Sequence, residues 1–136
     1  MMNDEQSKRL SEAADTLVQA WEALDEAREA LGDRRFESDQ ERERMVAAQQ
    51  MASRLDNAGK RIEDALRKGA IAAAAAGRTG AWPRYQESIV AAREGRQTGK
   101  SAQEADGVAN KRARGQEAWE RLNEAAEGAA TLVFLE

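Results

Sequence analysis

The hydrophobic positions of this chain recur in steps of three and four along most of its length. The longest such stretch keeps a single phase through ten apolar or small residues: Met45, Ala48, Ala52, Leu55, Gly59, Ile62, Leu66, Gly69, Ala73 and Ala76. Alternating steps of three and four keep one face of an α-helix directed at a neighbour. We therefore expect a long helix over 39–76 that packs against other helices through small side chains.

Two further stretches show the same alternation and predict long helices over 4–31 and 102–127. The first carries Leu10, Ala14, Leu17, Trp21, Leu24, Arg28 and Leu31, and the second carries Ala105, Val108, Arg112, Gly115, Trp119, Leu122 and Ala126. Pro83, the only proline, fits the first turn of a shorter helix over 83–94. No stretch alternates with a period of two, so we expect no sheet.

These elements predict one all-α domain over 1–136, an antiparallel helical bundle or coiled-coil hairpin of three long helices and one short helix with Ala-rich seams. We expect a polar loop over 96–100 and an apolar tail over 129–136. Pairs of a capping residue and a Glu or Gln three residues later predict three helix starts, Asn3/Gln6, Ser38/Glu41 and Ser101/Glu104. The i,i+4 pair Glu63–Arg67 is expected on the outer face of its helix.

The apolar content of the chain is mostly alanine, with 29 Ala against 19 residues of Leu, Val, Ile and Phe together. Alanine has the best helix propensity but buries little area, at about 25 cal/mol per Å². Stable helices with thin cores are the expected outcome. Part of the stability is then expected to come from a partner or from a homo-oligomer.

Several kinds of chemistry lack their usual residues. The chain has no His and no Cys, which removes the commonest general base, the commonest metal ligand and the thiolate nucleophile. The carboxylates Glu22, Asp25, Glu26 and Glu29 are at spacings typical of a solvated helix face. We therefore expect a protein that is not an enzyme, with no catalytic residues, cofactor, metal or small-molecule substrate. A polar N-terminus and the lack of a long apolar run predict a cytoplasmic protein, or one within a particle assembled there, with no membrane span.

The segment 95–101, GRQTGKS, partly matches the phosphate-binding pattern GxxxxGK[ST]. Its first glycine is one residue too close, and the residues before it look helical where the motif needs a strand. We interpret the segment as a capped loop between helices, with Lys100 placed near a helix N-terminus where it could hold an anion.

Charge is segregated along the chain, because residues 1–66 carry a net charge of −6 and residues 78–114 a net charge of +4. The basic residues of the second stretch are candidate contacts for a nucleic acid or another anion: Arg78, Arg84, Arg93, Arg96, Lys100, Lys111, Arg112 and Arg114. The alternative is that they face acidic helices of the same bundle or of a second copy.

The function these patterns favour is helix-to-helix association, as a structural, assembly or adaptor protein within a larger complex such as a virion or secretion assembly. The candidate partner-binding residues are those of the small-residue seam, one tryptophan in a predicted loop, and the apolar tail: Gly59, Gly69, Ala73, Trp82, Leu132, Val133, Phe134 and Leu135. A nucleic-acid-associated accessory protein is the first alternative. A small inhibitor that blocks a partner's site is the second.

Overall fold

Four α-helices make up nearly all of the described chain. The structure, a computed structural model, describes residues 4–77 and 82–134, without the side chains of 82 and 130–134. The helices are α1 (Asp4–Leu31), α2 (Glu41–Ala75), α3 (Trp82–Glu104) and α4 (Val108–Phe134), and the short 3-10 helix η1 (Arg34–Glu37) lies between α1 and α2. The prediction of an all-α fold is confirmed.

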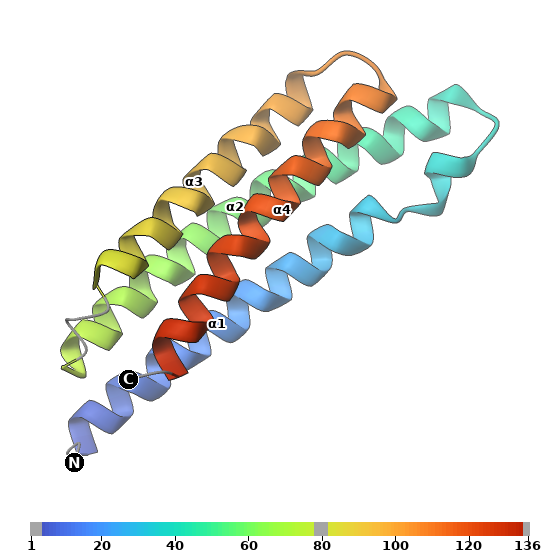
Figure 1. Cartoon of the computed structure of the whole chain (residues 1–136). Helices are drawn as coiled ribbons and strands as arrows, with labels where there is room; N and C mark the ends of the chain where they lie inside the picture. Colours follow the sequence, from blue (N-terminus) through green and yellow to red (C-terminus); the bar gives the residue numbers. More distant parts are fainter. Residues whose placement is uncertain (1–3, 78–81, 135–136) are drawn as a thin grey trace.

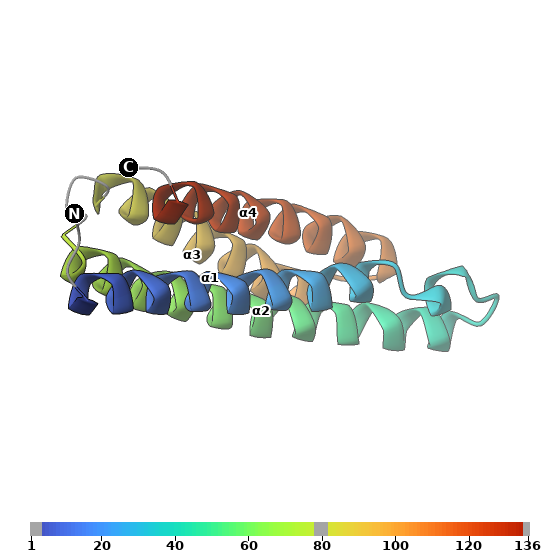
Figure 2. The same ribbon diagram turned by 90° about the horizontal axis from the view of Figure 1, so that it is seen from below.

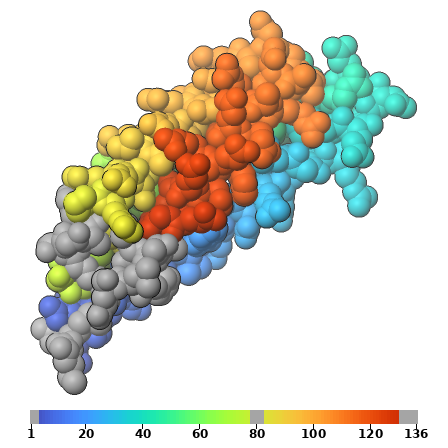
Figure 3. Space-filling view, in the orientation of Figure 1, coloured from blue at the N-terminus to red at the C-terminus, as the bar shows by residue number. Residues whose placement is uncertain are grey.

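The helices run antiparallel in two layers (Figures 1 and 2), with α1 and α2 in one layer and α3 and α4 in the other. The α1–α2 hairpin is the longer one, and its η1 end projects beyond the turn between α3 and α4 (Figure 3). The accessible surface is 8039 Å² for a chain of 14.9 kDa. A compact protein of this mass exposes about 7,000 Å². The molecule is therefore an elongated rod.

The predicted seam of α2 is the centre of the core. The seam residues from Ala48 to Ala76, taken in steps of three and four, are all buried, and Met45 is half-buried. The helix contacts α1, α3 and α4. Contact with α4, the helix diagonally opposite, is close because Gly115 has no side chain, and a Cβ there would stand 2.7 Å from Cε of Met51. Small residues therefore flatten the bundle along this diagonal.

The helix α2 runs without a break from Glu41 to Ala75, through both glycines that could have ended it. Each glycine is explained by a neighbour: a Cβ on Gly59 would stand 3.0 Å from Cβ of Arg96, and one on Gly69 would stand 2.9 Å from Oγ1 of Thr16. The helix ends at Ala75, and Gly77, two residues further on, has a φ of 88° in the left-handed region that glycine tolerates.

The buried face of α1 is centred beside the predicted stripe. Ala13, Ala20 and Ala27 are fully buried, whereas Trp21 is half-buried and Arg28 is exposed. The indole of Trp119 on α4 lies against α1, where its Nε1 donates to the Leu24 carbonyl oxygen at 3.3 Å. The predicted stripe placed Trp21 and Arg28 on the packed face, but five alanines together with Leu17 and Leu24 make up the buried residues of α1.

The predicted end of the third helix is wrong. Residues 96–100 are not a loop: α3 continues for ten residues past 94, to Glu104. Ser101 is not an N-cap, because its hydroxyl donates to the Gln97 carbonyl oxygen at 3.2 Å inside the helix. The chain turns at Gly107, where φ is 81°, and α4 begins at Val108 rather than at 102.

Two other boundaries differ from the prediction. The N-cap of α2 is Gln40, which makes no side-chain capping bond, while Oγ of Ser38 accepts a hydrogen bond from the Gln40 N–H at 3.1 Å. At the other end of the chain α4 continues through Gly128 and the predicted tail as far as Phe134. The predicted N-cap Asn3 and the tail residue Leu135 lie outside the described residues.

Candidate functional site

A cluster of three arginines around one buried carboxylate lies between α2 and α3. The two helices run antiparallel, which places Glu63 of α2 beside Arg93 and Arg96 of α3. Two glycines lie where the helices meet here. Gly59 packs on Arg96, and a Cβ on Gly99 would stand 3.6 Å from the Asp56 backbone nitrogen.

All three guanidinium groups donate to Glu63. Its Oε1 accepts from Nε of Arg93 at 2.9 Å and from Nη2 of Arg67 at 3.0 Å, and its Oε2 accepts from Nη1 of Arg96 at 3.1 Å. The Glu63 side chain is only 10% exposed, whereas those of Arg67 and Arg93 are 48% and 52% exposed. The carboxylate is therefore buried beneath the guanidinium groups, and two of the arginines reach solvent.

The charge of Glu63 is stabilised by these donors. Burial alone raises the pKa of the Glu63 carboxyl, but the hydrogen bonds from Arg93, Arg67 and Arg96 outweigh it and hold the pKa below its ordinary value of 4.5. One negative charge thus faces three positive charges. The cluster carries a net charge of +2, and no other carboxylate among the described residues forms an ion pair with its arginines.

The surroundings of the cluster are also charged. Lys60, one turn before Glu63, pairs with Oδ2 of Asp56 at 3.3 Å. Two buried atoms next to the cluster, Oδ1 of Asp56 and Nε of Arg96, have no hydrogen-bond partner. Lys100, one turn after Arg96 on α3, is exposed.

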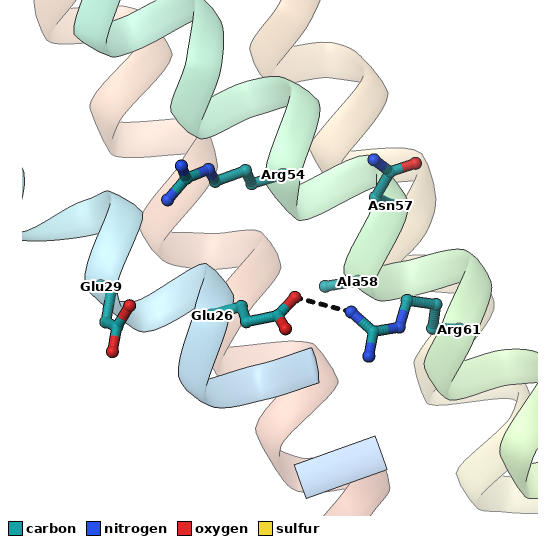
Figure 4. A pocket seen from close by; sticks show the side chains of 6 residues that line it. All are labelled: Glu26, Glu29, Arg54, Asn57, Ala58 and Arg61. Atoms are coloured by element: carbon teal, nitrogen blue, oxygen red, sulfur yellow. Dashed lines mark hydrogen bonds and ion pairs between the residues drawn. The ribbon is translucent and has the colours of Figure 1, made fainter. Parts of the chain in front are cut away.

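A second feature is an open groove of about 620 Å³ between α1 and α2, lined by Glu26, Glu29, Arg54, Asn57, Ala58 and Arg61 (Figure 4). Across it Nη1 of Arg61 donates to Oε2 of Glu26 at 2.6 Å. Both side chains are about half exposed or more, at 48% and 62%. Exposed pairs of this kind contribute little, about 0–1 kcal/mol. The acidic residues of α1, Glu22, Asp25, Glu26 and Glu29, form the solvated face that was expected.

The structure separates the predicted partner-binding residues into two groups. Gly59, Gly69 and Ala73 are buried inside the bundle, in contact with helices of the same chain. Trp82 is the first residue of α3, and Leu132, Val133 and Phe134 are the last residues of α4. Since α3 and α4 are antiparallel neighbours, these four positions lie at the same end of the bundle (Figure 1). Their role in partner binding stays a prediction.

Most of the predicted anion-contact residues have contacts within the chain. Besides Arg93 and Arg96, Arg114 pairs with Glu117 at 3.2 Å, and the Arg112 guanidinium carbon lies 4.2 Å from the centroid of the Phe36 ring. Lys111 is buried, and its Nζ donates to the Gln103 carbonyl oxygen at 2.6 Å. Arg84 and Lys100 are exposed, and Arg78 lies outside the described residues.

The interpretation of GRQTGKS as a capped loop with Lys100 near a helix N-terminus is wrong, because residues 95–101 are all inside α3 and Lys100 is near the C-terminal end of that helix. The partial match to the phosphate-binding pattern has no loop either. A helical backbone bonds its own N–H groups and cannot cradle a phosphate as a loop does. Gly95 is present for packing, because a Cβ there would stand 2.8 Å from Cγ of Leu122.

Neither Glu63 nor Arg67 was among the site residues predicted from the sequence. Their i,i+4 spacing predicted an exposed pair. The pair exists at 3.0 Å, but Glu63 is buried, with 7% of the whole residue exposed. A row of small buried residues on α2 shares Ala52 and Gly59 with the predicted seam, passes through position 63 and continues to Ala70. That row was the available signal that this face meets a third helix.

Comparisons of the chain with protein-family models, with curated proteins and with solved structures gave no match. Within residues 4–77 and 82–134, no group of three or more acidic residues has a geometry that could hold a metal ion. No helix in that part of the chain is long and apolar enough to cross a membrane.

Proposed function

We propose that this chain is a non-enzymatic assembly protein that associates with a second copy through the end of the bundle where α3 begins and α4 ends. One observation supports this proposal most strongly. The antiparallel α3–α4 pairing brings Trp82 and the segment 132–134 to one end of the molecule, although they are 50 residues apart in the sequence.

The residue types at this end suit an interface. Residues 132–135 are the densest run of bulky apolar residues in the chain, Leu-Val-Phe-Leu. Removing such side chains from water contributes about 25 cal/mol per Å². Tryptophan is enriched among the residues that contribute most to protein–protein binding. An aromatic residue and an apolar run at the same end therefore favour association there.

The small-residue seam has a different role in this proposal. Gly59 and Gly69 contact Arg96 and Thr16 of the same chain, so the seam holds the bundle together. Three large apolar side chains are exposed elsewhere, Val18 at 55%, Ile71 at 66% and Val90 at 49%. They lie on three different helices, and an isolated exposed apolar residue is ordinary on a protein surface.

The test compares two triple variants. Leu132→Ser, Val133→Ser and Phe134→Ser together remove apolar groups from the proposed end, while Val18→Ser, Ile71→Ser and Val90→Ser remove as many from the outer faces. Sedimentation velocity should show a concentration-dependent oligomer for the wild type and the outer-face variant, and a monomer for the first variant. Circular dichroism at 222 nm checks that each variant remains helical.

Thermal unfolding gives a second measurement. Because an oligomer is stabilised by mass action, the melting temperature of the wild type should rise over a hundredfold increase in protein concentration. A wild-type chain that sediments as a monomer and melts at one temperature throughout this range would contradict the proposal. So would a first triple variant that associates as well as the wild type.

A nucleic-acid-associated accessory protein is the second candidate. The observation in its favour is the cluster between α2 and α3, where Arg67, Arg93 and Arg96 surround one carboxylate. Contacts to a phosphate backbone weaken steeply as salt rises. Binding of a short single-stranded DNA that is strong at about 50 mM salt and lost at higher salt would support this function, and no binding at about 50 mM would exclude it.

A further inference from the structure

The arginine cluster has more positive charge than its own carboxylate can neutralise. Three guanidinium groups share Glu63, and both Arg67 and Arg93 donate to the same oxygen, Oε1. Two like charges that converge on one oxygen repel each other. An additional anion near the exposed sides of Arg67 and Arg93 would relieve that repulsion.

Unused donors remain on both arginines. A guanidinium has five N–H groups. Arg93 contacts Glu63 through Nε, which leaves both of its terminal nitrogens, the pair that binds an oxyanion end-on. Arg67 contacts Glu63 through Nη2 alone. Both side chains are about half exposed, so the remaining donors are accessible to a ligand from solvent.

Hydrogen bonds to the buried Glu63 carboxylate hold Arg67 and Arg93 in position. Glu63 holds one guanidinium from α2 and another from α3 by bonds of 3.0 and 2.9 Å. Arg96, 33% exposed, donates to the other oxygen of Glu63 and keeps that carboxylate in place. Two arginines that are already oriented lose less conformational entropy when they bind a ligand.

Nearby acidic residues other than Glu63 have their own cationic partners. Asp56 pairs with Lys60 at 3.3 Å, and Asp64 pairs with Lys68 at 3.0 Å. Glu94, on α3, pairs with Arg121 of α4. The excess positive charge of the cluster is therefore not cancelled by its surroundings.

We propose that Arg67 and Arg93, held by Glu63 and Arg96, form a binding site for a phosphate-type dianion on the surface where α2 and α3 meet. The net charge of +2 matches a dianion, and arginine forks match the oxygens of a phosphate. The two negative charges can belong to one phosphate group of a free phosphorylated compound, or to two neighbouring phosphodiesters of a nucleic-acid backbone, each of which carries one charge.

The test uses the full-length chain and two probes, pyrophosphate and a short single-stranded oligonucleotide, in nitrogen-15 NMR titrations at low ionic strength. We expect saturable shifts of the Nε–H signals of Arg67 and Arg93. Pyrophosphate binding alone assigns the site to free phosphorylated compounds, and oligonucleotide binding that requires Arg93 assigns it to a nucleic-acid backbone.

Variants separate this site from general charge effects. Arg67→Gln and Arg93→Gln should each weaken binding about tenfold, the loss expected for one charged hydrogen-bond donor. Arg121→Gln is the matched control, since it removes the same charge from the α3–α4 surface, where Arg121 pairs with Glu94 and Glu124, and should leave binding unchanged.

Two results would overturn the proposal. One is the lack of saturable binding by either probe to the folded wild type. The other is an equal loss of binding in Arg121→Gln and Arg93→Gln, which would mean that the probes respond only to net charge. Neither outcome depends on whether the chain self-associates, so this proposal and the proposed function are tested independently.

Discussion

Two glycines one turn apart on α3 differ in how closely their neighbours approach. A Cβ on Gly95 would stand 2.8 Å from both Cγ and Cδ2 of Leu122 and 3.2 Å from the Ala118 carbonyl oxygen. A Cβ on Gly99 would meet only ordinary van der Waals contacts, the nearest at 3.6 Å from the Asp56 nitrogen. The first glycine is therefore required by packing against α4, and the second is not required by its neighbours.

This difference predicts opposite effects of the same substitution. Gly95→Ala should lower the free energy of unfolding by about 1–3 kcal/mol, since Leu122 is fully buried and the nearby carbonyl belongs to the backbone. Gly99→Ala should raise it by about 0.5–1 kcal/mol through helix propensity. Urea unfolding followed by circular dichroism measures both. Equal effects of the two substitutions would show that packing at position 95 is looser than the distances indicate.

A second prediction concerns pH and the buried carboxylate. The folded pKa of Glu63 is below 4.5, so its ionised form stabilises the fold above pH 4.5, and this contribution is lost as the pH falls through the folded pKa. Glu63→Gln should cost about 1–3 kcal/mol at neutral pH, and the gap to the wild type should close in acid.

Thermal unfolding of the wild type and Glu63→Gln between neutral pH and pH 3 measures this gap. Glu26→Gln is the control, because Glu26 forms an exposed pair with Arg61 and should change stability by about 0–1 kcal/mol. The hydrogen bonds from Arg35 hold the pKa of Asp33 at about 2, which gives a pH dependence of the same sign, but Asp33 is present in both proteins and its contribution cancels in the gap. A gap that persists undiminished in acid would contradict the role assigned to Glu63.

At the scale of the elements, the end of α3 depends on one lysine of α4. The Nζ of Lys111 donates to the Gln103 carbonyl oxygen at 2.6 Å and to the Ala102 carbonyl oxygen at 3.3 Å. These are carbonyls of the last turn, which have no partner within the helix. A buried cation at a helix C-terminus also interacts favourably with the helix dipole.

Lys111→Met should therefore loosen the last turn of α3 while the bundle remains folded. The expected cost is about 1–3 kcal/mol, because buried carbonyls lose a charged donor. Hydrogen exchange should become faster at the backbone amides of 101–105 and remain unchanged in the middle of α2. Lys100→Met, at an exposed position of α3, is the control. Unchanged exchange in Lys111→Met would mean that the backbone turn alone ends the helix.

The sequence predicted α2 well, because its pattern is set by contacts that any neighbouring helix would make. A buried face of small residues requires only that some helix packs on it. The apolar spacing through Gly59 and Gly69 therefore predicted a continuous helix without identifying the neighbouring helix. The end of α3 was mispredicted because Gly95, Thr98 and Gly99 are typical of loops. Packing on Leu122 and on the Asp56 backbone overrides that local preference.

The candidate site was only half predictable for a related reason. Arg93 and Arg96 were identified from the basic stretch, but their partner was assigned to solvent. Glu63 has a satisfactory local partner in Arg67, so nothing in its own helix required another. Its burial follows from the register between α2 and α3, and that register depends on contacts between residues 30 or more positions apart.

At the scale of the whole molecule, charge is distributed unequally among the helices. With eight acidic and three basic residues, α1 carries a net charge of −5, whereas α2, with seven basic and five acidic residues, carries +2. These two helices form one layer of the bundle, so the most acidic helix lies beside the most basic one. Favourable charge therefore adds to the alanine packing of that hairpin.

Neither hairpin is expected to be stable without the other. The helix α2 makes contacts with both helices of the other layer. Met51 and Leu55 pack on Gly115 of α4, and Gly59 packs on Arg96 of α3. Five of the seven buried residues of α1 are alanines, which bury little area. Removing α3 and α4 would expose the core face of α2.

A fragment of residues 1–77 should therefore show less helix than the full chain and melt without a sharp transition. Mixing it with a fragment of residues 78–136 should restore helicity and cooperative unfolding, because the pair buries the faces that each leaves open. Circular dichroism of each fragment and of the equimolar mixture measures this. A fragment 1–77 with full helicity and a cooperative transition would show instead that charge and alanine packing stabilise the first hairpin on their own.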